Sequence, residues 1–181
     1  DPVRHITIIP RGQSLGSTWS TPKEDTAHMT RNEMYEKIVS LLGGRVAEEL
    51  YIGDISTGAS NDIERATKLA RDMVARYGMC EKLGAVSYLD DGEVFIGRDY
   101  QTTKSYSEKV AGTIDDEVKA LVDRAYAHCR KLLQENEQKL QQVTAFLLEN
   151  ENMTGAQFAA CMEGKPIEES SVTSLFDGIE E

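Results

Sequence analysis

The chain has 181 residues, of which 40% are hydrophobic and 28% charged, a composition typical of one globular domain. It contains no run of about 18 apolar residues, so we expect no membrane-spanning segment in it. A net charge of -11 with no basic cluster argues against nucleic-acid binding, and three widely spaced cysteines predict reduced thiols rather than a disulfide framework.

The N-terminal region is predicted to contain a small β element. The β-branched residues of 3–9 show partial alternation and predict a strand, which ends at Pro10. Residues 15–20 contain the only tryptophan and predict a second strand that pairs back on the first. A polar loop is expected over 21–25.

Two helices are predicted next. Thr30 and Glu33 form a capping-box pattern that begins a helix of apolar periodicity reaching residue 50. Gly43 and Gly44 lie inside it at a cost of roughly 2 kcal/mol relative to alanine, so we expect a close packing contact there. A second helix is predicted over 60–77, with a glycine directly after it as a stop signal.

The second half of the chain is also predicted to be mainly helical. Residues 83–96 indicate a hairpin or an irregular loop. Helices are expected over 107–133 and 135–148, and a capping-box pattern at 154–157 predicts a short third helix. From Pro166 the chain turns acidic and Ser-rich, and 166–181 are expected to form a disordered tail. The predicted fold class is therefore mainly α, with a small β element near the N-terminus.

Residue chemistry alone indicates no catalytic site. The chain contains three histidines that lack metal-ligand spacing: His5, His28 and His128. Glycine-rich phosphate loops and nucleophile-elbow motifs are absent from the sequence. Asp62, considered alone, is an acid in the first turn of a helix, and Asn61 with Glu64 reads as a capping pair. The residues by themselves predict a mainly helical domain and no particular activity.

Several ordered motifs nevertheless resemble one family. Residues 56–67 read STGASNDIERAT, and further matching motifs lie in 1–16, 29–49, 73–83 and 93–108. Together these segments resemble, in order, the peptidase domain of FtsH-type ATP-dependent zinc proteases, and the resemblance covers about residues 1–162.

The resemblance implies a metallopeptidase fold and a zinc site. In the family, a His-Glu-x-x-His helix supplies two histidine ligands and the general base, and an aspartate from a later helix is the third ligand. Asp62 matches that aspartate, whereas the histidine motif occurs nowhere in the 181 residues. Thr57 and Asn61 are candidates to orient Asp62 by hydrogen bonds, and Gly58 is the candidate for a tight turn beside it.

Two further expectations concern surfaces. The strand residues Ile6, Thr7, Ile8 and Ile9 are candidates for an edge on which an extended substrate would add as another strand, the alternative being an ordinary core strand. Without the histidine helix, an apolar groove is expected beside the helices at 30–51 and 60–77. The pair Glu48–Glu49 is interpreted as helix surface and packing rather than as metal ligands.

The resemblance also predicts the context of the chain. Residues 1–165 would be a peptidase domain lacking its N-terminal part, which by itself binds no zinc tightly and cleaves nothing. The whole protein would be a membrane-anchored homo-hexamer on the cytosolic face, with an upstream ATPase module that uses ATP and magnesium to feed polypeptide substrates. Membrane contact would be made only through segments outside this sequence. The alternative is a non-catalytic helical domain that binds protein partners.

Overall fold

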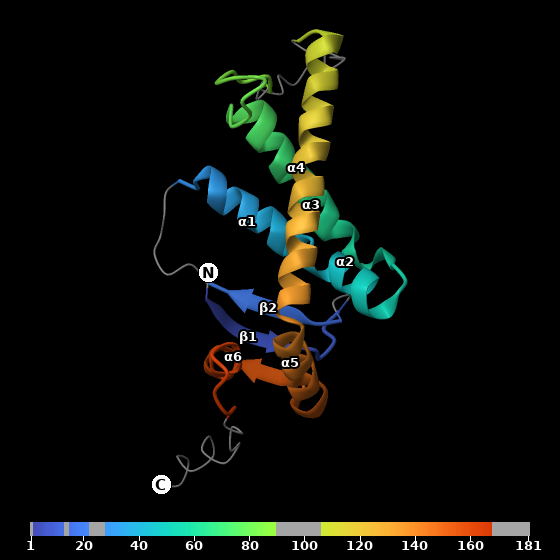
Figure 1. The fold of residues 1–181 in the computed structure, drawn as a ribbon, viewed down its shortest axis with the longest axis vertical. Coiled ribbons are helices and arrows are strands. Elements are labelled where there is room, and N and C mark those ends of the chain that lie inside the picture. The colour runs from blue at the N-terminus through green and yellow to red at the C-terminus, as the bar shows by residue number, and fades with distance from the viewer. Residues whose placement is uncertain (1, 13–14, 22–27, 90–105, 168–181) are drawn as a thin grey trace. The chain divides into compact units, whose positions relative to one another are not determined.

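The computed structural model describes residues 2–12, 15–21, 28–89 and 106–167 (Figure 1). Their contacts group into two units, one drawn from the two ends of the chain and the other from the continuous stretch between them. The boundaries of the central unit are residues 27 and 135. None of the helices in the described ranges is both long and apolar enough to cross a membrane.

The secondary-structure elements described in the central unit are all helical. Its elements are α1 (Arg31–Leu41), α2 (Gly43–Ala47), the π-helical turn η1 (Glu48–Ile52), the 3-10 turn η2 (Thr57–Ala59), α3 (Ser60–Arg71), the π-helical turn η3 (Asp72–Arg76) and α4 (Glu108–Glu135). α1, α2 and α3 all pack against the long helix α4, and α1 also packs against α3 (Figure 1).

The predicted start and end of the first helical segment, which runs through α1, α2 and η1, are confirmed. Thr30 caps α1 with both hydrogen bonds of the capping box, to and from Glu33. Only Leu42 separates α1 from α2, and the backbone bonds continue across it, since Leu42 N donates to Ile38 O and Val46 N to Leu42 O. The segment ends at Gly53, whose φ of 75° is a left-handed conformation that glycine adopts without strain.

The explanation expected for the two internal glycines is wrong. A Cβ atom added to Gly43 or to Gly44 would meet nothing within 4 Å, so no close approach by another backbone requires glycine there. Neither residue has a positive φ. Within the described part of the chain, the pair therefore carries its helix-propensity cost without a packing reason.

The core of the central unit lies where α1, α2, α3 and α4 meet. Most of its residues recur at spacings of three or four along the helices, which places them on one face of each helix. The buried core residues are Met34, Ile38, Val39, Leu42, Val46, Ala66, Ala70, Met73, Val74, Ala75, Cys80, Ile114, Val118, Leu121, Ala125 and Cys129.

The other unit combines a small sheet with two helices. Its elements are β1 (Val3–Thr7), β2 (Ser17–Ser20), α5 (Glu137–Asn150), β3 (Asn152–Thr154) and α6 (Gly155–Met162). The sheet order is β2-β1-β3, with both pairs antiparallel, so β1 is the central strand. The capping box of Thr154 and Gln157 begins α6 as predicted. The strand β3 was not predicted, because its three residues lie between two helical patterns.

The fold class is confirmed as mainly α with a small sheet. The helix at 60–77 is confirmed by α3 and η3, and the helices at 107–133 and 135–148 by α4 and α5. Residues 83–89 form irregular backbone, while the rest of the predicted 83–96 loop, most of the 21–25 loop and residues 168–181 of the tail lie outside the described ranges. The extent of a single domain over 1–165 stays a prediction.

Candidate metal centre

Asp62 lies in the first turn of α3, directly after the short turn η2. Its side chain is 48% exposed and forms an ion pair with Arg65, whose Nη1 lies 3.7 Å from Asp62 Oδ1. An exposed pair at this distance contributes little stability. The carboxylate therefore remains accessible to a metal ion or to another positive group.

A hydrogen-bonded chain holds the segment that leads into α3. Glu48, the first residue of η1, accepts hydrogen bonds from the Ser56 hydroxyl at 2.6 Å and from Ser56 N at 3.0 Å. Ser56 Oγ in turn accepts from Gly58 N at 3.1 Å and so caps η2. The hydroxyl and then the backbone N–H of Ser56 hold the pKa of Glu48 below its ordinary value. Glu48 thus fixes the path of the chain toward Asp62, a role that sequence reasoning missed.

The neighbouring carboxylate of Glu49 is engaged elsewhere. The Tyr126 hydroxyl donates to Glu49 Oε2, and Arg130 Nη1 lies 2.7 Å from Glu49 Oε1. These bonds, that of Tyr126 first, hold the pKa of Glu49 below its ordinary value and tie η1 to α4. Glu48 therefore binds the segment before α3 and Glu49 binds α4, in agreement with their interpretation as packing residues.

The other sequence-predicted residues of the segment lie close to Asp62 in the chain. Thr57 and Gly58 are exposed in η2, and Asn61 is exposed at the start of α3. Within the part of the chain that the structure describes, no hydrogen bond joins Thr57 or Asn61 to Asp62, so their orienting role stays a prediction. The capping role of Asn61 with Glu64 is wrong, because α3 begins from η2 with Ala59 at its cap position and no side-chain cap bond.

The central residues of β1 do not form the free sheet edge that the sequence predicted. His5, Ile6 and Thr7 face β2 on one side and β3 on the other, so their backbone is already paired in both directions. Beyond them, Ile8 N donates to Glu151 O at 3.0 Å and Ile9 N to Thr7 Oγ1 at 3.2 Å. The strand is central because of β3, which the sequence did not reveal. In the described part of the chain the sheet has two edge strands, β2 and β3, and all four residues of β2 are exposed.

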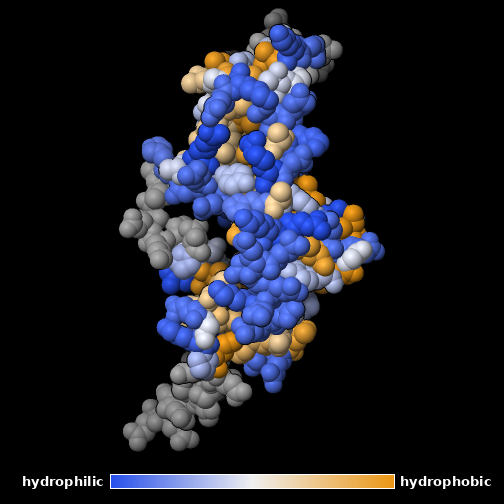
Figure 2. All heavy atoms as spheres, viewed as in Figure 1, coloured by the Kyte–Doolittle hydropathy of each residue, from blue (hydrophilic) through white to orange (hydrophobic). Residues whose placement is uncertain are grey.

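Exposed apolar side chains occur near the start of α3. Ile52 is 73% exposed, Ile55 52% and Ile63 38%. Hydrophobic surface is visible on the right of Figure 2, where Figure 1 shows the chain after α2. This surface lies beside the two helices at which the sequence predicted an apolar groove.

The described residues contain one candidate ligand of the expected zinc site rather than a whole site. In residues 2–12, 15–21, 28–89 and 106–167, no three His, Cys, Asp or Glu side chains cluster closely enough to hold a metal ion. The accessible carboxylate of Asp62 offers a hard oxygen donor, the kind of atom that Zn²⁺ accepts from aspartate.

Comparison with known proteins determines the family. The model of peptidase family M41 matches residues 1–161. The chain belongs to peptidase family M41. This M41 chain is 49% identical over 168 residues to "ATP-dependent zinc metalloprotease FtsH 1" of Thermoanaerobacter sp. (strain X514), covering 92% of the chain and 28% of that relative.

Other relatives show the same relationship. "ATP-dependent zinc metalloprotease FtsH" of Caldicellulosiruptor bescii is 48% identical over 87% of the M41 chain and 26% of its own length. The protein of the same name from Ruminiclostridium cellulolyticum is 43% identical over 97% of the chain and 29% of its own length. The chain thus spans between a quarter and a third of the length of these curated relatives, and its match is to a peptidase domain.

Proposed function

We propose that this M41 chain supplies Asp62 as the third protein ligand of the catalytic zinc in an ATP-dependent endopeptidase. The observation that carries the proposal is the accessible Asp62 carboxylate at the start of α3, at the end of a segment held by Glu48 and Ser56. The names of the relatives, zinc metalloproteases, support the same chemistry.

The remaining parts of the site come from outside the 181 residues. Two histidines and a general-base glutamate complete the centre, and a bound zinc ion would activate water and polarise the scissile carbonyl. The contribution of this chain is a negative oxygen held in place by a preformed loop. Because a single carboxylate does not hold zinc, the isolated chain binds no zinc tightly and is inactive.

The substrates are polypeptides in extended conformation. The exposed edge strand β2, rather than the central β1, is the element on which such a substrate can add through backbone hydrogen bonds. Trp19, 64% exposed on β2, would contact substrate side chains. Recognition through backbone bonds gives weak sequence preference, which suits a protease that degrades many proteins.

The same proposal includes the wider assembly. The whole protein is a membrane-anchored homo-hexamer with this domain on the cytosolic face. Its ATPase module, which uses ATP and magnesium, lies outside these residues and delivers unfolded substrate. The names of the relatives support the ATP dependence.

The test uses the chain extended upstream by the parent's His-Glu-x-x-His region. Bound zinc is measured by atomic absorption and cleavage by release of fragments from casein. Asp62→Asn is expected to abolish both, whereas Glu64→Gln, a matched loss of one charge at an exposed site on the same helix, should leave both intact. Full zinc binding in Asp62→Asn would refute the ligand assignment. Absence of zinc and cleavage in the unsubstituted extended chain would favour a non-catalytic interaction domain.

A further inference from the structure

A pocket separate from Asp62 lies within the central unit. It has a volume of about 330 Å³ and is formed by the start of α1, η3, the turn at residues 79–82 and one face of α4. Glu117, Leu121 and Arg124 line it from α4, and their spacing of four and three residues places them on one helix face. A pocket of this size accommodates a small molecule or a single amino-acid residue.

The floor of this pocket is apolar. Met73 is 2% exposed, Val74 4% and Leu121 8%, so the buried core closes the pocket on this side and offers a small hydrophobic area. Met79 adds a flexible thioether that adapts to the shape of an apolar group. A ligand that uses this floor therefore carries a short hydrophobic part.

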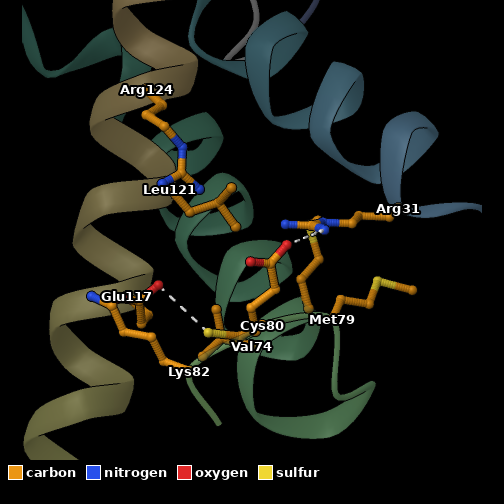
Figure 3. A pocket seen from close by; sticks show the side chains of 10 residues that line it. Arg31, Val74, Met79, Cys80, Lys82, Glu117, Leu121 and Arg124 are labelled. Atoms are coloured by element: carbon orange, nitrogen blue, oxygen red, sulfur yellow. Dashed lines mark hydrogen bonds and ion pairs between the residues drawn. The ribbon is translucent and has the colours of Figure 1, made fainter. Parts of the chain in front are cut away.

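The rim carries an excess of positive charge. Arg31, Lys82 and Arg124 line the pocket together with two carboxylates, Glu81 and Glu117, which leaves one net positive charge in a chain of net charge -11. Figure 3 shows Arg124 on α4 on one side and Arg31 on the other. An anionic group is thus favoured at the rim.

Only one of the three cations is firmly paired. The side chain of Lys82 donates to Glu117, which raises the pKa of Lys82 and lowers that of Glu117. Cys80 Sγ also donates to Glu117, at 3.5 Å, so this carboxylate is fully engaged (Figure 3).

The two arginines remain available. Arg31 Nη1 lies 3.9 Å from the Glu81 carboxylate, and the side chains are 56% and 92% exposed, so water competes strongly with this pair. Among the described residues, no hydrogen bond or ion pair involves the Arg124 guanidinium, although its charge helps to lower the pKa of Glu117. A guanidinium group binds a carboxylate through two parallel N–H···O bonds, which is the recognition that this rim offers.

We propose that this pocket binds a carboxylate attached to a short branched apolar group, with the carboxylate on Arg31 and Arg124 and the apolar group on the Met73–Val74–Leu121 floor. The C-terminal residue of a peptide has this chemistry, and so does a short-chain carboxylic acid. The proposed peptidase function would supply peptides as one source of this ligand. The inference itself depends on the charge of the rim, the volume of the pocket and its apolar floor.

The test is a titration of the 181-residue chain, labelled at its methionine methyl groups, followed by NMR. Two of its six methionines, Met73 and Met79, line the pocket. The probes are N-acetyl-alanyl-leucine, its C-terminal amide, 4-methylpentanoate and inorganic phosphate. Addition of the free acids should shift the signals of these two methionines only, and the amide and phosphate should not. The tighter of the two acids identifies the source of the ligand.

Three variants sharpen the result. Arg124→Gln is expected to weaken binding of the better acid by about tenfold. Glu81→Gln should strengthen it, because the competing carboxylate on Arg31 is removed. Lys119→Gln is the matched control on the same helix, since Lys119 is exposed, pairs with Asp123 and does not line the pocket. Before titration, a methionine spectrum that matches that of the unsubstituted chain verifies the fold of each variant.

Four results would overturn the assignment. The first two are binding of the amide as tight as that of the acid, and binding of phosphate as tight as that of the acid. The third is equal affinity of the Arg124→Gln and Lys119→Gln variants for the acid. The fourth is that no probe shifts the signals of Met73 and Met79. None of these measurements involves zinc or cleavage, so they are independent of the proposed peptidase site.

Discussion

Replacing the two internal glycines of the first helical segment by alanine should stabilise the chain. Gly43 and Gly44 have ordinary helical backbone, and added Cβ atoms would meet nothing within 4 Å. Alanine therefore fits without strain and restricts the unfolded chain more than glycine does. The direction of the effect is opposite to that expected if a neighbouring backbone packed against them.

The size of the effect follows from helix propensity. Each Gly→Ala change in a helix interior gains about 1 kcal/mol, so the double variant gains about 2 kcal/mol. Neither added Cβ atom meets another atom within 4 Å, so neither change opposes the other through a clash. For a chain of this size the gain corresponds to a rise of about 6 °C in the midpoint of thermal unfolding.

The assay is urea and thermal unfolding followed by circular dichroism at 222 nm, with Gly78→Ala as the matched control. Gly78 has a φ of 60°, and its added Cβ would lie 2.8 Å from Ala85 Cα, so this change should destabilise the chain by more than about 1 kcal/mol. A loss of stability in the Gly43→Ala, Gly44→Ala double variant would refute the reasoning. If stability rises while zinc binding by the extended chain falls, this face contacts a segment outside the 181 residues.

Three further results are expected. Glu48→Gln should lower the zinc affinity of the extended chain by about tenfold, measured with a competing chelator, whereas Glu49→Gln should lower it less because that carboxylate binds α4 instead. In unfolding titrations, the Lys82–Glu117 pair should stabilise the folded chain at neutral pH. This contribution should fall as pH drops below about 4.5, because folding lowers the pKa of Glu117. It should also fall as pH rises above about 10.5, because folding raises the pKa of Lys82. Glu117→Gln should flatten both limbs, and an unchanged profile would contradict the pairing. Gly155→Ala should destabilise the chain by about 1–3 kcal/mol in urea, because its Cβ would lie 2.4 Å from a carbonyl oxygen of β1; an unchanged midpoint would show that the contact relaxes.

Local sequence signals predicted the helices well. The capping boxes at Thr30 and Thr154 each depend on residues three apart, and both form as expected. The periodicity of 107–133 likewise needs only neighbouring turns to be recognised. These elements were predictable because their decisive interactions lie within a few residues along the chain.

Other contacts could not be predicted because no local pattern reveals the partner. The central position of β1 depends on β3, nearly 150 residues away, so no local pattern distinguishes it from an edge strand. The hydrogen bond from Ser56 to the Glu48 carboxylate joins two separate elements. Neither a serine nor a glutamate is unusual at its position, so the sequence gives no signal of this bond. The assignment of Asp62 came from the family resemblance, because an acid at a helix start is explained equally well by the helix dipole.

The pairing of β1 with β3 has a consequence for the order of events during synthesis. Ile6 pairs with Met153, so β1 meets its second neighbour only after residues 152–154, nearly 150 positions later, have been synthesised. Residues 27–135 are contiguous, and their shorter-range contacts can form earlier. A nascent or prematurely ended chain that lacks β3 therefore carries β1 with one side open to pairing with other chains, a point at which chaperone binding or aggregation would begin.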